Sequence, residues 1–441
     1  MVVGVARGGL ALLIVVLVVA CTLWARGPRR SVGARVLPAS CPVPTLPIRG
    51  DVCERVFATR ERPCVLGNHS TLCMDFPNRP LGADEFAAAR LPGVSAQVRL
   101  QIINNEILIV HDKAHSLATK YPRTLLRHVR HIACAARRVG LPDVDFLLHT
   151  GDGTPPFPVL AHATLASTPP DQRTYHVPTD TGVSRWTPAP SRERCAGRPT
   201  AEEREDWEHR DPRLQYRGSA NGPRVDLDGW SANSRARLSA LSTIFPGWID
   251  SRLTQMFGSE NETRVLSRFI SIGKGMPMAR AKRYRYVMHL DGNGQANRLP
   301  NLMHTGTTLV LMASKYDVYL SASVHRIPHV FPIELDMSDL MTTLSCFRKH
   351  PDLALERARL GLDVARRLIT FKNVVVLYWA DLLEHYARMM RFPVVRHPNA
   401  IPVAKYKFIL DGHWKRPDMY EIRELVFPYN MSLGVYADHG D

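Results

Sequence analysis

The sequence predicts an α/β protein with two doubly wound, Rossmann-like lobes behind an N-terminal membrane anchor and a cysteine-rich extension. Three observations carry this prediction. The 441 residues are enough for two sizeable domains. Short apolar segments alternate with helical patterns in both halves, which is the order that builds parallel sheets covered by helices. Glycine-rich polar loops follow several strands, and ligands of open α/β sheets bind at the carboxyl ends of strands.

The N-terminus has the composition of a membrane anchor. Gly8–Ala25 is uncharged and apolar, with Arg7 before it and Arg26 after it. The segment is short for a span of about 20 residues, but it suits a thin endomembrane. A cleaved signal peptide is the alternative, because short apolar cores are typical of such peptides. We favour an uncleaved single-pass anchor at residues 1–25, with the remainder in the lumen of the endoplasmic reticulum or Golgi.

Residues 26–90 are predicted to form a stem and a cysteine-rich extension. Four cysteines lie close together there without histidines at metal spacing, which predicts two disulfides that staple the extension: Cys41, Cys53, Cys64 and Cys73. Their spacings are too long for a zinc knuckle. Cys134, Cys195 and Cys346 are dispersed, and the sequence leaves their pairing open.

The first lobe is placed at residues 91–208. Val98–Val110 predicts two short strands around an Asn-Asn turn, which is a hairpin signal. Pro122–Gly140 has apolar residues at helical spacing and a glycine at its end. Val144–Leu148 predicts a strand, and the polar loop after it contains Asp152. A side chain at the carboxyl end of a strand is a candidate for chemistry.

The second lobe is placed at residues 209–400, with a C-terminal extension at 401–441. Leu214–Gly222 predicts a short strand that breaks into a Gly/Ser loop, and Ser231–Met256 opens with Ser/Asn capping residues and continues into a helix. Asp336 or Ser338 is expected to cap a later helix. Two further helical patterns close the lobe.

A glycine loop, Asp291–Arg298, lies between two apolar strands, Tyr286–Leu290 and Thr307–Met312. Pro300 stands where the first turn of a helix tolerates proline. A loop that opens a helix collects unpaired backbone N–H groups at the positive end of the helix dipole. The glycine loop is therefore a candidate anion site.

Two competing interpretations of this loop fail on residue identity. A calcium hand would need glycine at its sixth position and glutamate at its twelfth, where Ala296 and Leu302 stand. A dinucleotide fingerprint would use Gly292 and Gly294, but Asn297 occupies its third glycine position. An ordinary connection within an α/β sheet remains as the alternative to an anion site.

The chain is strongly basic, with a formal net charge of +16. Its arginines are scattered, without a compact basic run or interleaved aromatic residues, so we expect no nucleic-acid partner. A solvated arginine-rich surface accounts for the charge. A few arginines gathered at a phosphate-binding cleft fit the same total.

The chain resembles the capsule-associated and Rumi-like protein O-glucosyltransferases over about residues 96–400. The motifs that carry the resemblance follow in the family's order: "LPDVDFLLHTGD", "YRGSANG", "NSRARL", "RYRYVMHLDGNGQANRL", "TGTTLVLM" and "PHVFPIELDMSDL". The resemblance implies a lumenal glycosyltransferase of the two-lobed type-B fold that uses UDP-glucose or UDP-xylose, inverts the anomeric centre and needs no metal. A hydroxyl of a protein or glycan would be the acceptor, and we expect a monomer.

The family's functional positions fall on residues with suitable chemistry. Asp152 matches the catalytic aspartate and would accept the proton of the acceptor hydroxyl; a turn-forming aspartate is the alternative. Arg298 matches the arginine that binds the diphosphate, for which a permanently charged fork is suited. Ser219 and Arg235 match further donor contacts, and Arg217 is either another or structural within its strand. The remaining expected donor contacts lie in the glycine loop: Asn293, Gly294, Gln295, Ala296 and Asn297.

The sequence also departs from the family. Tyr216 stands where many members have tryptophan, and Ala296 replaces a common serine. Residues 153–210 align poorly, so the acceptor stays open. A metal-dependent type-A transferase is the enzymatic rival, because Asp143-Val-Asp145 and Asp226-Leu-Asp228 spell DxD. A non-catalytic UDP- or glycan-binding relative and a xylosyltransferase for polysaccharide or lipid-linked glycan also fit the sequence.

Overall fold

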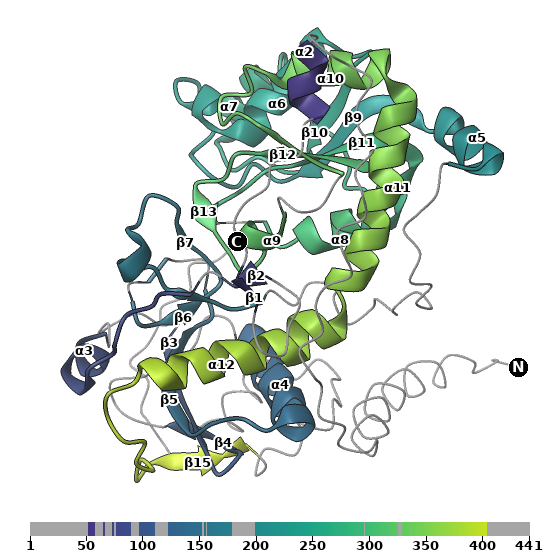
Figure 1. The fold of residues 1–441 in the computed structure, drawn as a ribbon. Helices are drawn as coiled ribbons and strands as arrows, with labels where there is room; N and C mark the ends of the chain where they lie inside the picture. Colours follow the sequence, from purple (N-terminus) through teal and green to yellow (C-terminus); the bar gives the residue numbers. More distant parts are fainter. Residues whose placement is uncertain are drawn as a thin grey trace, which may run out of the picture.

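Figure 1 shows the fold, which comes from a computed structural model. The structure describes residues 52–57, 65–66, 73–74, 76–89, 97–110, 122–151, 154–155, 157–178, 199–294, 296–324 and 329–403. The predicted anchor Gly8–Ala25, the predicted base Asp152 and Gln295 of the glycine loop lie outside these ranges. Within them, none of the helices has both the length and the apolar character needed to cross a membrane.

The C-terminal sheet is five-stranded and wholly parallel, in the order β10-β9-β11-β12-β14. Its strands are β9 Asp211–Gly218, β10 Ile249–Leu253, β11 Tyr284–His289, β12 Thr308–Met312 and β14 Val330–Ile333. Strand β10 pairs with one edge of β9, whereas β11, β12 and β14 follow on its other side. The strand order therefore reverses between β9 and β11. Outside the carboxyl ends of such a pair, open α/β sheets form a ligand crevice.

Helices pack around this sheet: α5 Ala201–His209, α6 Ser234–Ile244, α7 Glu260–Leu266, α8 Leu299–Met303, α10 Leu340–Lys349 and α11 Pro351–Leu368. Aromatic rings fill its core, where Tyr286 stacks on Phe347 with centroids 5.0 Å apart. The edge strands β10 and β14 were not predicted from the sequence. The first is short and polar, and the second contains Pro332, which a strand tolerates only at an edge.

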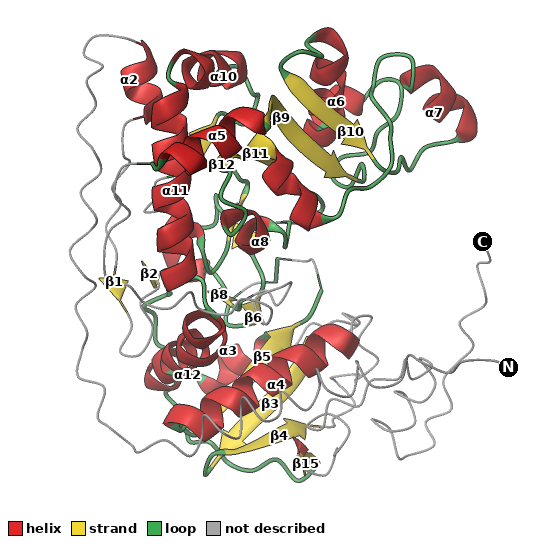
Figure 2. Ribbon diagram, turned by 90° about the vertical axis from the view of Figure 1, so that its right-hand side faces the viewer, coloured by secondary structure: helices red, strands yellow, loops and turns green. Residues whose placement is uncertain are grey.

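The N-terminal sheet is six-stranded and mixed, in the order β15-β4-β3-β5-β6-β8. Its strands are β3 Gln97–Ile103, β4 Glu106–Val110, β5 Val144–His149, β6 Leu160–Ala161, β8 Tyr175–His176 and β15 Ala400–Pro402. Strands β5, β6 and β8 run parallel, whereas the pairs that involve β3 and β4 are antiparallel. Helix α4 (Pro122–Val139) packs against the π-helix Phe371–Leu377 and against α12 (Tyr378–Met389) beside this sheet (Figure 2).

Local turn chemistry confirms two sequence predictions. Asn104 and Asn105 have φ angles of 51° and 65°, the left-handed pair that a tight hairpin turn requires between β3 and β4. Gly140 ends α4 with a φ of 76°, and its N–H donates to the carbonyl of Ala136 at 3.1 Å. A residue with a Cβ would be strained at this position.

The N-terminal part of the described chain corrects the predicted disulfides. Helix α2 (Val52–Phe57) lies on the C-terminal lobe beside α10, and Cys53 is bonded to Cys346, 293 residues away. The prediction that Cys53 pairs within the N-terminal cluster is therefore wrong. The reason is packing, because Phe57 is fully buried edge-on against Phe331, with centroids 5.6 Å apart. Cys41 and Cys64 lie outside the described residues.

The two sheets meet through elements that lie between them in Figure 1: α8, α9 (Ser321–Val324) and β13 (Tyr316–Asp317). Strand β7 (Thr164–Leu165) follows β6 and pairs with β13, which follows β12. The carboxyl ends of β6 and β12 therefore face each other. Short elements complete the described fold: α3 Ala83–Ala88, and the pair β1 Val65–Leu66 and β2 Cys73–Met74.

We predict that Cys346→Ser lowers the free energy of unfolding by about 2–4 kcal/mol, because the bridge restricts the unfolded chain. Urea unfolding monitored by fluorescence measures the change. Reducing agent should lower the stability of the wild type by more than it lowers that of the variant. Equal urea midpoints for the oxidised wild type and Cys346→Ser would show that α2 is held by packing alone.

Candidate functional site

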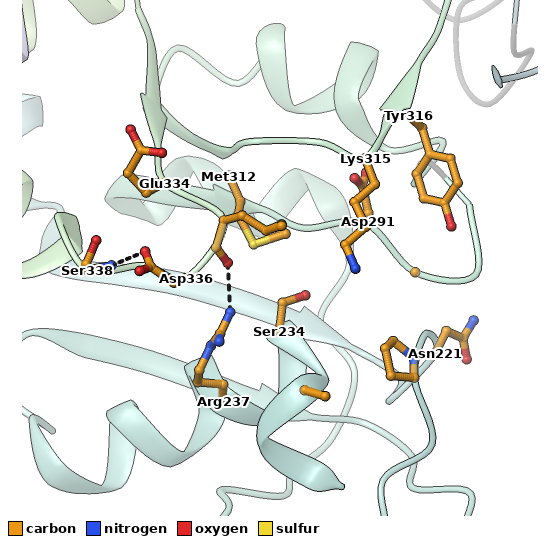
Figure 3. A pocket seen from close by; sticks show the side chains of 14 residues that line it. Asn221, Ser234, Arg237, Asp291, Met312, Lys315, Tyr316, Glu334, Asp336 and Ser338 are labelled. Carbon is orange, nitrogen blue, oxygen red and sulfur yellow. Dashed lines mark hydrogen bonds between the residues drawn. The ribbon is translucent and has the colours of Figure 1, made fainter. Parts of the chain in front are cut away.

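A pocket of about 610 Å³ lies at the carboxyl ends of β9, β11, β12 and β14. Figure 3 shows its walls, which come from the loops after these strands and from α6. Its lining residues are Asn221, Pro223, Ala232, Ser234, Arg237, Asp291, Gly292, Met312, Lys315, Tyr316, Glu334, Leu335, Asp336 and Ser338. The pocket therefore lies where the reversal of strand order predicts a ligand crevice.

A buried arginine ties together the two loops at this reversal. Arg235, only 4% exposed, donates from Nε to the carbonyl of Asp291 at 2.7 Å and from Nη1 to the carbonyl of Ser219 at 2.9 Å. Burial lowers the pKa of its guanidinium. A Cβ on Gly292 would lie 2.8 Å from Nη2 of this arginine. Glycine is therefore required there so that the loop can approach the guanidinium.

Asn233 orders the start of α6 at the pocket. Its side-chain oxygen accepts hydrogen bonds from the backbone N–H groups of Arg235 and Ala236, at 3.0 and 3.1 Å. Its amide nitrogen donates to the carbonyls of Ala220 and Pro223, at 3.1 and 2.8 Å. The predicted Ser/Asn cap is thus confirmed, and the same residue fixes the loop after β9.

Arg298 lies across the carboxyl end of β9. Its guanidinium is 4.8 Å from the ring centroid of Tyr216, donates to the Tyr216 hydroxyl at 3.0 Å, and donates to the carbonyl of Arg217 at 2.5 Å. A Cβ on Gly218 would lie 2.8 Å from Nη2 of Arg298. Because these partners are neutral, they hold the guanidinium in place without cancelling its charge, which acts on the site.

Arg217 is engaged elsewhere. It forms an ion pair with Asp250 of β10, in which Nη2 lies 2.9 and 2.8 Å from the two carboxylate oxygens. Although burial opposes ionisation, hydrogen bonds from Arg217 and Tyr284 hold the pKa of Asp250 below its ordinary value. These contacts agree with the structural interpretation of Arg217, because they join β9 to β10.

The described residues of the glycine loop are held mainly through backbone groups. The N–H of Gly292 donates to the carbonyl of Gly294 at 2.8 Å, and the side-chain oxygen of Asn293 accepts from the N–H of Gly222 at 2.9 Å. The carbonyl of Ala296 is 3.0 Å from Nε2 of buried His289, whose pKa burial lowers to about 3. A neutral imidazole can donate this bond without adding charge. Asn297 lies next to Arg298 in the chain and is exposed.

Asp291 places a carboxylate inside the pocket. Burial raises the pKa of Asp291 to about 6. The Ser314 hydroxyl donates a hydrogen bond to Oδ2 at 2.6 Å, which lowers the pKa but does not offset the effect of burial. The charge of Arg235 and the backbone of Ala296 also favour the ionised form, but burial outweighs them. Ionisation near neutral pH is therefore costly at this position.

Sequence reasoning missed the far wall of the pocket. Arg237 donates to the carbonyl of Leu335 at 2.7 Å, and Asp336 accepts from the N–H of Ser338 at 2.9 Å (Figure 3). The predicted cap of α10 is wrong, because the N-cap is Asp339 and Asp336 closes the preceding turn. Glu334, directly after β14, completes this wall, and recognising β14 as a strand would have pointed to it. Lys315 lies at the other end of the pocket, beside Asp291 and Tyr316 (Figure 3).

The DxD motifs have structural roles. Asp145 is buried and accepts from Arg99, at 2.9 and 2.6 Å, and from Gln101. Asp226 accepts from the N–H of Gly229 at 2.6 Å, which closes a turn. In the part of the chain that the structure describes, no three His, Cys, Asp or Glu side chains are grouped so as to hold a metal ion.

The loop that contains Asp152 follows β5, which is buried along its length. Thr150 and Gly151, directly before the aspartate, are buried as well. Because β5 and β6 are parallel, this loop leaves the sheet on the edge from which β7 reaches β13.

We predict that Asp291→Asn changes the pH dependence of stability. Because the folded pKa of Asp291 lies above its unfolded value, its contribution is fully present below about pH 4 and is lost as pH rises through about 6. A shift of this size corresponds to about 3 kcal/mol. Relative to the wild type, the variant should gain stability as pH rises from about 4.5 to about 7.5 in urea unfolding. Parallel pH profiles for the two proteins would contradict the assignment.

Comparison with known proteins places this site in a sequence family. The model of glycosyl transferase family 90 matches residues 181–422, which is more than half of the chain and contains the whole pocket. The resemblance expected over residues 96–400 is thus supported from residue 181 onward.

Individual relatives are distant. The chain is 21% identical over 193 residues to protein O-glucosyltransferase 1 of Rattus norvegicus, covering 44% of this chain and 46% of the relative. It is 24% identical over 194 residues to protein O-glucosyltransferase 3 of the same species, and this match covers 44% of this chain and 37% of the relative. An O-glucosyltransferase rumi homolog of Anopheles gambiae is 22% identical over 202 residues, covering 45% and 47%. The chain thus spans less than half the length of each of these relatives, and the family match identifies it as a member of glycosyl transferase family 90.

Proposed function

We propose that this protein transfers a sugar from a UDP-sugar to a hydroxyl of a protein or glycan acceptor. The observation that carries the proposal is the family match over residues 181–422, which encloses the pocket at the reversal of strand order. The relatives are protein O-glucosyltransferases by name. They favour UDP-glucose as the donor, with UDP-xylose as the second candidate.

The geometry suits a two-lobed type-B transferase. In the proposed arrangement the nucleoside occupies the pocket, against Met312 and near the carboxylate of Glu334, which can accept hydrogen bonds from ribose hydroxyls. The diphosphate lies toward the glycine loop, where the guanidinium of Arg298 supplies positive charge. Ser219, directly after β9, contributes a neutral hydroxyl.

The proposed mechanism is a single inverting displacement. The carboxylate of Asp152 accepts the proton of the acceptor hydroxyl as that oxygen bonds to the anomeric carbon. The bond between the anomeric carbon and the UDP oxygen breaks, and Arg298 stabilises the negative charge of the departing diphosphate. Because arginine supplies this charge, the proposal includes no metal cofactor.

The location of the protein is proposed with the activity. A lumenal enzyme of the endoplasmic reticulum or Golgi, held by Gly8–Ala25, agrees with the bridge between Cys53 and Cys346, since structural disulfides persist in oxidising compartments. We propose a monomer. Two competing functions are those of a UDP- or glycan-binding relative without activity and of a xylosyltransferase acting on polysaccharide or lipid-linked glycan.

The decisive experiment incubates the purified lumenal portion with UDP-glucose or UDP-xylose, with and without EDTA, and measures release of UDP. Hydrolysis or transfer that EDTA leaves intact supports the proposal. UDP binding without turnover would favour the non-catalytic function. Loss of activity in EDTA with rescue by Mn²⁺ would favour the metal-dependent rival.

We predict that Asp152→Asn retains UDP affinity and loses on the order of 10² or more in turnover, because the amide cannot accept the proton. Initial rates and calorimetric UDP titration measure the two quantities. Asp143→Asn, just before the start of β5, is the matched control and should keep normal turnover. Near-normal transfer by Asp152→Asn would remove this residue from the mechanism.

We predict that Arg298→Ala weakens UDP binding by about 1.5–3 kcal/mol, or about 10- to 150-fold in Kd, because it removes a charged donor. Ser219→Ala should weaken UDP binding by about half as much, since the hydroxyl carries no charge of its own. Arg264→Ala, which removes an arginine of α7, is the control for net charge. Equal affinities for Arg298→Ala and Arg264→Ala would contradict the predicted diphosphate contact.

A further inference from the structure

A small antiparallel pair, which we call the latch, joins the two lobes beside the pocket. It consists of β7 and β13, with Tyr316 opposite Leu165 and Asp317 opposite Thr164. The N–H of Ala166 extends the pairing to the carbonyl of Lys315, at 2.8 Å. Each partner belongs to a different sheet region, because β7 follows β6 and β13 follows β12.

An ion pair secures the latch on the side of the N-terminal lobe. Nη1 of Arg173 lies 3.1 Å from the Asp317 carboxylate, and both side chains are mostly buried, at 19% and 21% exposed. The same guanidinium donates to the carbonyls of Thr168 and Ala166, at 3.0 and 3.2 Å. Arg173 thus shapes the turn after β7 and holds β13 against it, and it is not among the residues that line the pocket.

On the opposite side, Tyr316 of the latch and Ser314, two residues before it, contact the glycine loop through their hydroxyl groups. The Tyr316 hydroxyl donates to the carbonyl of Asn293 at 3.0 Å, and the Ser314 hydroxyl donates to Asp291 at 2.6 Å. Ser314 also accepts from the N–H of Tyr316 at 2.9 Å, which fixes the two hydroxyls relative to each other. In Figure 3, Tyr316 and Asp291 lie at the same end of the pocket.

The hydrogen bond from Tyr316 to the glycine loop is linked to a second hydrogen bond, which reaches the loop after β9. Asn293, held by Tyr316 through its carbonyl, accepts from the N–H of Gly222 through its side chain. Burial, reinforced by the charge of Asp291, raises the pKa of Tyr316, so its hydroxyl stays protonated and available to donate. A continuous chain of hydrogen bonds therefore runs from the N-terminal lobe to both loops at the reversal of strand order.

We propose that Tyr316 is a positioning residue of the nucleotide-sugar site, which sets the shape of the glycine loop according to whether β7 and β13 are paired. The glycine loop takes its binding shape only when the N-terminal lobe is docked on β13. Donor binding and the acceptor-side lobe are thereby coupled. The choice of a UDP-sugar as ligand rests on the proposed function, whereas the coupling itself does not.

Hydrogen exchange on the ligand-free, purified full-length protein tests the coupling directly. Tyr316→Phe removes only the hydroxyl, and Arg173→Met releases the latch without touching the pocket. Both should speed amide exchange in peptides that cover the glycine loop about three- to tenfold, the factor expected for one lost hydrogen bond. Tyr378→Phe is the matched control, since its hydroxyl also donates to a backbone carbonyl, that of His176, at 3.1 Å. It should leave exchange in the glycine loop unchanged.

Calorimetric titration with UDP provides the functional measurement. Tyr316→Phe and Arg173→Met should each raise the Kd for UDP about three- to tenfold. The loss of binding free energy in the double variant should be smaller than the sum of the losses in the two single variants, because both residues act through one chain of contacts. Wild-type exchange and affinity in Arg173→Met would overturn the proposal. If the wild type binds no UDP, the proposed function fails, and the exchange measurement still decides whether the latch positions the glycine loop.

Discussion

The site depends on one buried cation that backbone carbonyls hold. The Arg235 guanidinium donates to the carbonyls of Ser219 and Asp291, and these belong to the loops after the two strands between which the sheet reverses. Displacement of either loop would leave part of a desolvated charge without its acceptor. The two loops therefore keep their spacing only while both accept from this arginine. This constraint accounts for glycine at position 292, where a Cβ would collide with the guanidinium.

Positive charge accumulates around this point in an ordered way. Arg298 lies over the ring of Tyr216 and donates hydrogen bonds to carbonyl and hydroxyl oxygens. Arg217, next in sequence to Tyr216, forms an ion pair with Asp250 instead. The neighbouring histidine, His289, stays neutral because burial lowers its pKa. The net charge of +16 thus includes cations that have carboxylate partners and others held by neutral groups at the pocket. The second kind adds most to the attraction of an anion.

Much of this arrangement could be predicted from the sequence because it depends on local chemistry. The Asn-Asn hairpin turn, the glycine end of α4, the Asn233 cap and the glycine loop between two buried strands each follow from neighbouring residues. The edge strands and the far wall of the pocket could not be predicted, because they depend on pairing partners distant in sequence. The cap of α10 was mispredicted because Asp336 closes the turn before the helix instead of capping it. The bridge from Cys53 to Cys346 is the clearest case. Proximity in sequence favoured pairing within the cluster, whereas burial of Phe57 places Cys53 beside α10.

The path of the chain also limits how the lobes can separate. Helix α2 is bonded to the C-terminal lobe, and the chain then builds five strands of the N-terminal sheet, all five strands of the C-terminal sheet, and finally α12 and β15 on the N-terminal sheet again. The described chain thus passes between the lobes repeatedly, and the latch adds a contact at the mouth of the pocket. A wide hinge opening would have to break the pairing of β7 with β13 together with the buried packing between α8 and the N-terminal core. Small displacements of β13 cost far less, and through Tyr316 they reach the glycine loop directly.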